Sequence, residues 1–229
     1  MQLNTVIFDM DGLLIDSEPL WGQAAEEILA QFKVKLTTEQ YHLHTGLRTR
    51  EFLTWWFAYF NISPTHLDKA ENDLIDLVMY KIGQTPRFMP GVPYIIDFFR
   101  DRRFNIGLAS SSPMRLIDFV ENLGQMKGCF QVKTSAEFLS HGKPHPQVYL
   151  NCAEQLGASP LQCVAFEDSF NGMIAAKAAR MKCVVVPAHD QQKQPRWAAA
   201  DLKLSSLANF NELLLDGIEG PAALNTVAS

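Results

Sequence analysis

Four short apolar runs constrain the fold of this 229-residue chain more than any other feature of its sequence. Within each run the apolar side chains follow one another, without the apolar–polar alternation that marks a strand with one solvated face. Continuous runs are typical of strands that are covered on both faces, as in a parallel sheet. The four runs occupy residues 5–8, 106–109, 163–166 and 183–186, and residues 130–133 form a weaker fifth run.

Helical patterns separate the later runs. Apolar residues recur at three- and four-residue spacing in residues 113–123, 146–156 and 171–181. An alternation of strands and helices is typical of parallel sheets whose two faces are covered by helices. The sequence therefore predicts an α/β fold built on a doubly wound, Rossmann-like parallel sheet.

A long helical segment interrupts this alternation after the first run. It contains no convincing strand, Pro19 opens it, and a stretch with Pro and Gly at residues 85–91 closes it. We expect an all-helical cap domain at residues 18–87, inserted into a core domain that comprises residues 1–17 and 88–216. Its helices are predicted at residues 24–32, 51–60 and 67–82. The small and polar residues 217–229 predict a poorly ordered C-terminal tail.

Composition excludes several classes of partner. A net charge of −5 and a pI near 5.7 argue against non-specific binding of nucleic acid. The four cysteines are far apart and form no CxxC pair, which indicates reduced thiols. The sequence contains neither a signal-peptide pattern nor an apolar run of the ~20 residues that span a membrane. We expect a cytoplasmic protein with no membrane partner, and a monomer, because no exposed apolar helix is left over.

Acidic and polar residues follow the predicted strands at the points where the strands end. Asp9 and Asp11 follow the first run, Ser110 follows the second, and Glu167 and Asp168 follow the third. Ligands of open parallel sheets bind outside the carboxyl ends of the strands. These residues are therefore expected to converge on one site although they are far apart in the chain.

Carboxylates this close in the chain either point away into water or share a cation, because like charges repel and are costly to bury unpaired. Oxygen ligands alone favour Mg²⁺ over zinc. Asp9, Asp11 and Asp168 are predicted to share a divalent cation. Together with Ser110 and with Lys143, which lies in the loop before residues 146–156, this cation predicts an anion site in an acidic protein.

Four motifs in chain order resemble those of the haloacid dehalogenase superfamily. They are Asp9-Met10-Asp11-Gly12, Ser110 after an apolar strand, Gly142-Lys143-Pro144 and Glu167-Asp168. The inserted helical segment is similar to the cap of the β-phosphoglucomutase-like branch. Residues 11–21, 46–48 and 143–150 look like the 2-deoxyglucose-6-phosphate and hexitol phosphatases of that branch.

This resemblance implies a phosphatase that depends on Mg²⁺ and acts on a small phosphorylated sugar or hexitol. Asp9 would be the nucleophile that forms an aspartyl phosphate, and Asp11 would act first as general acid and then as general base. The metal would be held by the side chains of Asp9 and Asp168 and the carbonyl oxygen of Asp11, and by Glu167 directly or through water.

The resemblance also implies how the phosphoryl group is bound. Ser110, Ser111 and Lys143 would bind its oxygens. Ser169 is expected to cap the helix that begins near Asn171, and Asn171 is expected to orient the metal-binding acids.

Other functions of this fold are less compatible with the sequence. The resembling hexose phosphomutases carry a His where this chain has Trp21 and a Lys where it has Thr45, so both positions favour hydrolysis. The resembling dehalogenases lack the second Asp of the first motif, and a protein that only binds phospho-ligands would not need both Asp9 and Asp11. Arg48 and Arg50 are open between two roles: surface charges or substrate contacts in the cleft.

Overall fold

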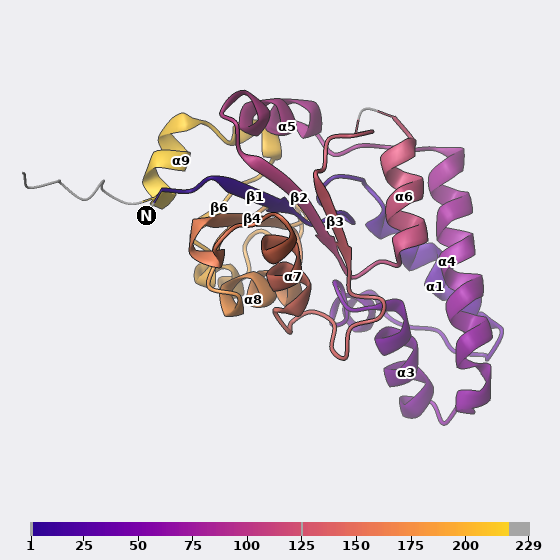
Figure 1. Cartoon of the computed structure of the whole chain (residues 1–229). Helices are drawn as coiled ribbons and strands as arrows, with labels where there is room; N and C mark the ends of the chain where they lie inside the picture. The colour runs from indigo at the N-terminus through magenta and orange to yellow at the C-terminus, as the bar shows by residue number, and fades with distance from the viewer. Residues whose placement is uncertain (1, 125, 220–229) are drawn as a thin grey trace, which may run out of the picture.

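A six-stranded parallel sheet forms the centre of the computed structural model, which describes residues 2–124 and 126–219 (Figure 1). The strand order is β3-β2-β1-β4-β5-β6. The strands are β1 (Thr5–Phe8), β2 (Asn105–Ser110), β3 (Val132–Ser135), β4 (Cys163–Glu167), β5 (Lys182–Val185) and β6 (Leu202–Lys203). The chain crosses between neighbouring strands through helices, so the predicted doubly wound α/β sheet is confirmed.

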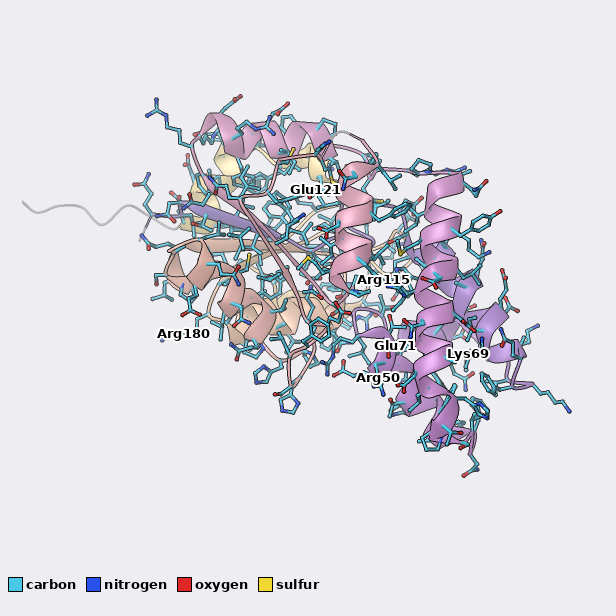
Figure 2. The ribbon with its side chains drawn as sticks, turned by 45° about the vertical axis from the view of Figure 1, so that its right-hand side comes forward. Arg50, Lys69, Glu71, Arg115, Glu121 and Arg180 are labelled. Carbon is cyan, nitrogen blue, oxygen red and sulfur yellow. The ribbon has the colours of Figure 1, made fainter. Side chains whose placement is uncertain are left out.

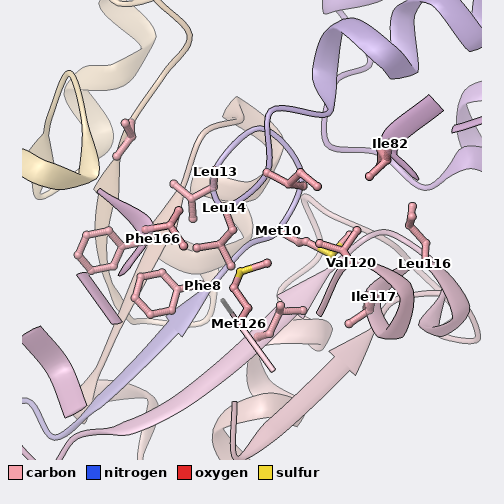
Figure 3. Close-up of a cluster of buried hydrophobic side chains, with 14 of the residues drawn as sticks. Phe8, Met10, Leu13, Leu14, Ile82, Leu116, Ile117, Val120, Met126 and Phe166 are labelled. Carbon is pink, nitrogen blue, oxygen red and sulfur yellow. The ribbon is translucent and has the colours of Figure 1, made fainter. Parts of the chain in front are cut away.

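Both faces of the sheet are buried, which explains the continuous apolar runs. In β1, Val6 and Phe8 point into one core cluster, and Ile7 points into a second cluster on the opposite face. The helices α5 (Val92–Asp101), α6 (Met114–Asn122) and α9 (Glu212–Glu219) contribute to the first cluster, and α7 (Gln147–Gln155) and α8 (Phe170–Ala178) contribute to the second. Figure 3 shows Phe8 and Phe166 of adjacent strands side by side in the first cluster.

The two outer strands β3 and β6 deviate most from the predictions. β3 lies two residues beyond the predicted run at 130–133, because Phe130 is buried before the strand and the strand itself contains Lys133, Thr134 and Ser135. β6 has two residues and was not predicted. A strand at the edge of a sheet has a less complete apolar environment, so its sequence carries a weaker pattern.

The segment after β1 is helical, as predicted. It forms α1 (Glu18–Ala30), α2 (Thr38–His42), α3 (Thr49–Tyr59) and α4 (Leu67–Gln84), which lie to one side of the sheet in Figure 1. The prediction that the first helix begins near residue 24 was wrong, because α1 begins at Glu18 and Pro19 lies in its first turn. Proline fits there, since the first amide groups of a helix have no partner within the helix.

Two stretches connect the helical segment to the core, and they run side by side. The amide of Asp16 donates to the carbonyl of Arg87 at 2.8 Å, and the amide of Met89 donates to the carbonyl of Leu14 at 3.0 Å. Beyond this joint, Ile82 of α4 packs near the α6 side chains that Figure 3 labels. The helical segment is therefore anchored to the core through two hydrogen-bonded stretches of backbone and an apolar contact.

The C-terminal prediction was wrong for its first residues. Gly217, Ile218 and Glu219 belong to the last turn of α9, and Ile218 is buried in the first core cluster. The rest of the predicted tail, residues 220–229, lies outside the described residues. Among the residues that are described, no helix is both long enough and apolar enough to cross a membrane.

Candidate active site

The carboxyl ends of the three central strands place the first residues of the site. Phe8 at the end of β1 pairs with Leu108 of β2 and with Phe166 of β4. The next residue, Asp9, donates its amide to the carbonyl of Phe166 at 3.0 Å. This register places Asp9 between the ends of β2 and β4, as the sequence predicts.

Lys143 forms the centre of a buried charge network. Its Nζ donates to Asp9 Oδ1 at 2.6 Å, to Glu167 Oε1 at 2.6 Å and to the carbonyl of Ala109 at 3.1 Å. Burial alone would lower the pKa of Lys143, but the carboxylates of Asp9 and Glu167 outweigh it and raise the pKa above its ordinary value. Lys143 is therefore a fixed positive charge at the nucleophile predicted from the sequence.

Glu167 is held from two further sides. Tyr149 of α7 donates its hydroxyl to Oε1 at 2.5 Å, and Ser169 donates its hydroxyl to Oε2 at 3.1 Å. Ser169 also caps α8, as predicted, because its Oγ accepts from the amide of Gly172 at 3.0 Å. Gly172 has no side chain to obstruct the carboxylate: a Cβ there would lie 1.9 Å from Glu167 Oε1. Sequence reasoning missed Tyr149, although it lies six residues after Lys143.

Neutral donors surround Asp11. Its Oδ1 accepts from Ser17 Oγ at 2.7 Å and from Trp21 Nε1 at 2.8 Å, and its Oδ2 accepts from Ser112 Oγ at 2.7 Å. Sequence reasoning had none of these partners, because they come from the residue before α1, from α1 itself and from the loop after β2. Trp21 belongs to the helical segment, so a cap side chain holds a carboxylate of the core.

Three carboxyl groups of the core lie close together. Ligand oxygens of Asp9, Glu167 and Asp168 fall within 4.8 Å of one another. Burial raises the pKa of Asp9 to about 7; the charge of Lys143 offsets part of this rise, and the charge of Glu167 adds to it. Burial also raises the pKa of Asp168, and the neighbouring charges of Glu18 and Asp9 add to it. A cation bound between such carboxyl groups would stabilise their ionised forms by offsetting the repulsion between them.

These residues fit a divalent cation. Lys143 contacts Oδ1 of Asp9, so Oδ2 of the same carboxylate can face an ion. Gly12, at φ +72°, leaves room for Asp168, since a Cβ there would lie 2.1 Å from its Oδ2. Among the described residues, Oε2 of the nearby Glu18 is buried without a hydrogen-bond partner. An all-oxygen donor set with excess negative charge is the chemistry of a hard cation site.

One cavity connects the core residues with the helical segment. Asp9, Asp11 and Asp168 line it together with Ser110 and Ser111. The helical segment lines the remaining wall mainly with polar and aromatic side chains, which are Glu18, Trp21, Tyr41, His44, Thr45, Thr49 and Phe52. The predicted site residues that face this cavity are therefore enclosed by residues whose role the sequence left unassigned.

The loop before α3 closes directly onto the core. Ser111 Oγ donates to the carbonyl of Gly46 at 2.7 Å, and Asn171 Nδ2 donates to the carbonyl of Thr45 at 2.9 Å. The amide group of Asn171 thus binds the cap, which differs from the expected role of orienting the acids. Gly46 has φ +85°, and a Cβ there would lie 2.5 Å from Ser169 Oγ, so the close approach requires glycine.

The two arginines that the sequence left open have different surroundings. Arg48 donates from Nη1 to the carbonyls of Ala136 at 3.2 Å and Leu139 at 2.5 Å, in the loop that leads to Lys143. Arg50 pairs with Glu71 and Asp68 within the helical segment, and half of its side chain is exposed. Arg48 is therefore a contact between cap and core, and Arg50 is a surface charge.

Comparison with known proteins agrees with this geometry. The profile of the haloacid dehalogenase-like hydrolases matches residues 3–180, so the chain belongs to this family, and the resemblance drawn from the four motifs is confirmed. The chain is 42% identical over 210 residues to hexitol phosphatase B of Escherichia coli, which covers 91% of this chain and 95% of that protein.

Two further proteins are similar over most of the chain. The phosphorylated carbohydrates phosphatase of Thermotoga maritima is 29% identical over 189 residues, covering 82% of this chain and 86% of that protein. The crystal structure of β-phosphoglucomutase from Clostridium difficile superposes with a TM-score of 0.83 at 21% identity, covering 92% of this chain and 94% of that one. The structural likeness supports the fold alone.

Proposed function

We propose that this chain is a Mg²⁺-dependent phosphatase that hydrolyses small sugar or sugar-alcohol phosphate monoesters through an aspartyl phosphate on Asp9. One observation carries the proposal: a buried Lys143 lies 2.6 Å from Asp9, while Asp11, which lines the same cavity as Asp9, is held by three neutral donors. A nucleophile paired with a positive charge and a separate acid–base group are the two parts that such a hydrolysis needs.

In the first step, an Asp9 oxygen attacks phosphorus and the bond from phosphorus to the sugar oxygen breaks. Asp11, in its protonated form, gives its proton to the leaving oxygen. Lys143 keeps Asp9 in place and favours its ionised form, which is the form that attacks. The Lys143 ammonium is held in turn by hydrogen bonds to Tyr149 and Glu167.

In the second step, Asp11 takes a proton from a water molecule, and the resulting hydroxide attacks the phosphorus of the aspartyl phosphate. Asp9 leaves as a carboxylate, and inorganic phosphate is released. Ser17, Trp21 and Ser112 keep the Asp11 carboxylate in one orientation through both steps. Catalysis by a positioned acid–base group typically contributes ~10²–10⁴-fold.

The phosphoryl oxygens are assigned to Lys143, Ser110 and Ser111. Ser110 is buried at the end of β2, and its hydroxyl accepts from the amide of Ser112 at 3.0 Å, which fixes the start of the loop. We assign the cation to the carboxylates of Asp9 and Asp168 and the carbonyl oxygen of Asp11, with Glu167 bound directly or through water. When bound, Mg²⁺ supplies positive charge that offsets the developing charge on the phosphoryl oxygens.

Hydrolysis is favoured over the phosphomutase alternative. Trp21 donates a hydrogen bond to Asp11 at 2.8 Å, and an indole N–H can only donate, so it holds the carboxylate without competing for its proton. Thr45 lines the cavity where the resembling mutases carry a Lys. The similarity to hexitol phosphatase B supports a sugar or hexitol phosphate as substrate.

The remaining assignments follow from the same proposal. We place the boundaries between core and cap after residue 17 and after residue 87, because the two crossings between them are hydrogen bonded at Leu14–Asp16 and Arg87–Met89. None of the four cysteines, all of which lie among the described residues, forms a disulfide, which supports a cytoplasmic location. We propose a monomer, which size-exclusion chromatography with light scattering would test.

The decisive experiment measures phosphate release from a panel of monoesters, with Mg²⁺ and with EDTA. The panel contains 2-deoxyglucose 6-phosphate, mannitol and sorbitol phosphates, glucose 1- and 6-phosphates, a nucleotide and phosphoglycolate. The proposal expects Mg²⁺-dependent release that is fastest for hexose or hexitol phosphates. Release confined to nucleotides or phosphoglycolate contradicts the substrate class, and conversion of glucose 1-phosphate to glucose 6-phosphate without release favours a mutase.

A further inference from the structure

Arg48 fastens the cap to the core loop that carries Lys143. Besides the carbonyls of Ala136 and Leu139, its guanidinium reaches the carbonyl of Ser140 at 3.5 Å. Its side chain is only 16% exposed. A guanidinium has five N–H donors in a planar fork, so it can satisfy several carbonyls of one loop at once. A substrate-facing arginine would point its fork into the cavity instead.

Glu51 completes the contact from the first turn of α3. Its Oε1 accepts from Arg48 Nη2 at 2.5 Å and from the amide of Gly142 at 3.2 Å. Its Oε2 accepts from the amide of Arg48 at 3.3 Å. Burial alone would raise the pKa of Glu51, but the hydrogen bonds from Arg48 and Gly142 outweigh it and lower the pKa. Glu51 therefore stays ionised and binds cap and loop together.

Gly142 allows the two sides to approach. A Cβ at this position would lie 2.6 Å from Glu51 Oε2 and 2.9 Å from Arg48 Nε. The φ angle of Gly142 is not in the left-handed region, so the backbone itself would accept an alanine. The requirement for glycine here is thus a requirement for contact with the cap.

The contact ends one residue before Lys143. The loop of residues 136–142 leads from β3 to Lys143, and its carbonyls and the Gly142 amide are bound by the cap. A shift of this loop would move the Lys143 ammonium relative to Asp9, which it now contacts at 2.6 Å. A misplacement of about 1 Å can cost about 10²-fold in rate.

We propose that Arg48 and Glu51 are positioning residues that order residues 136–142 and thereby bring Lys143 into its phosphoryl-binding position when the cap closes. This inference rests on the proposed function, because it assigns phosphoryl binding to Lys143. According to this proposal, the anion site is completed only when the cap closes. With the cap open, residues 136–142 lose their hydrogen bonds to Arg48 and Glu51, and Lys143 is no longer held in position.

The test combines loop protection, phosphate affinity and turnover in four variants. Arg48→Met removes the fork, Arg48→Lys keeps the charge with a single donor group, and Gly142→Ala displaces the contact without removing a charge. Arg50→Met is the matched control, because Arg50 is a nearby cap arginine that pairs with Glu71 within the cap (Figure 2). Circular dichroism and thermal unfolding establish that each variant is folded.

The proposal expects three linked changes in Arg48→Met. Amide hydrogen exchange of residues 136–142 becomes at least about tenfold faster, the inhibition constant of inorganic phosphate rises about tenfold, and kcat/KM falls about 10- to 100-fold. Gly142→Ala changes the same three quantities in the same direction. Arg48→Lys recovers part of each loss, and Arg50→Met matches the wild type in all three.

Other outcomes overturn the proposal. Unchanged exchange of residues 136–142 in both Arg48→Met and Gly142→Ala means that the cap does not order the loop. Faster exchange with unchanged phosphate affinity means that loop order does not position Lys143. Failure of the proposed function looks different: the wild type releases phosphate from none of the esters, while loop protection and phosphate affinity still depend on Arg48.

Discussion

Asp9 and Asp11 are two residues apart in one loop, yet their carboxylates meet opposite surroundings. Asp9 faces the ammonium of Lys143 and the carboxylates of Glu167 and Asp168 in a buried position. Asp11 faces two hydroxyl groups and one indole N–H. The neighbours of the two side chains thus suit the two roles that the proposed mechanism gives them: a nucleophile beside a fixed positive charge, and an acid–base group whose orientation is fixed by neutral donors.

The largest loss of turnover is expected for a substitution that removes the negative charge of Asp9. Asp9→Asn keeps the shape of the side chain but removes its nucleophilic oxygen, so turnover falls by ~10⁴-fold or more, as for other nucleophile deletions. Phosphate release with excess Mg²⁺ measures this, and Asp68→Asn on the cap surface is the control. Substantial release by Asp9→Asn would sink the assignment of Asp9 as nucleophile.

Asp11→Asn should lose less activity than Asp9→Asn, and the loss should differ between a sugar phosphate and p-nitrophenyl phosphate. The amide cannot transfer a proton, so kcat for a sugar phosphate falls by ~10²–10⁴-fold. With p-nitrophenyl phosphate, the leaving group needs no proton, so the first step is preserved and the second step is slow. A burst of about one equivalent of nitrophenol in rapid mixing is the expected signature, and equal losses for both esters without a burst would contradict the acid–base role.

Trp21→Phe tests the cap's share in the surroundings of Asp11. It removes the N–H at Asp11 Oδ1 but keeps an aromatic ring, so kcat falls about tenfold, which is about 1.4 kcal/mol and close to the value of one hydrogen bond to a charged group. Ser17→Ala removes the other donor to the same oxygen and is the matched variant. A change in KM alone would indicate that Trp21 contacts substrate and does not position Asp11.

The last prediction concerns stability and cation binding, not turnover. Burial raises the pKa of Asp9 from 3.8 to about 7 and that of Glu18 from 4.5 to about 8. Between pH values of about 4 and about 8, these two carboxyl groups hold protons in the folded chain that they have released in the unfolded chain. The free energy of unfolding without metal therefore falls as the pH rises through this range.

A bound cation replaces those protons. Mg²⁺ should therefore raise the melting temperature more at pH 8 than at pH 6, and at 100 times its Kd it adds about 2.7 kcal/mol. Thermal unfolding in EDTA and in MgCl₂ at both pH values measures the difference. If the EDTA-treated protein gained stability between pH 6 and pH 8, the crowded-carboxylate account of this site would be wrong.

Much of the site could be predicted because strand ends converge. Asp9, Ser110 and Glu167 follow central strands whose apolar runs are unambiguous, and the parallel topology then places them at one edge. The partners of Asp11 and Lys143 could not be predicted in this way. Trp21 and Tyr149 reach them from helices, and the angle at which a helix packs does not follow from its own periodicity.

The errors in the fold have the same origin. β3 was shifted by two residues because an edge strand with Lys133 and Thr134 carries little apolar signal. The resemblance implies that Asn171 orients the metal-binding acids, but its amide binds the carbonyl of Thr45 in the cap. The local sequence indicates where such residues lie along the chain, but the tertiary packing determines which groups they contact.

The joint between cap and core also makes the cap a replaceable unit. Leu14–Asp16 and Arg87–Met89 meet through backbone hydrogen bonds, so the inserted segment begins and ends at nearly one point. Segments whose ends are close together can be inserted or removed with little disturbance of the host domain. A cap from another family member could therefore be grafted at the same joint to redirect substrate choice, provided that it supplies counterparts of Trp21 at Asp11 and of Arg48 at the loop before Lys143.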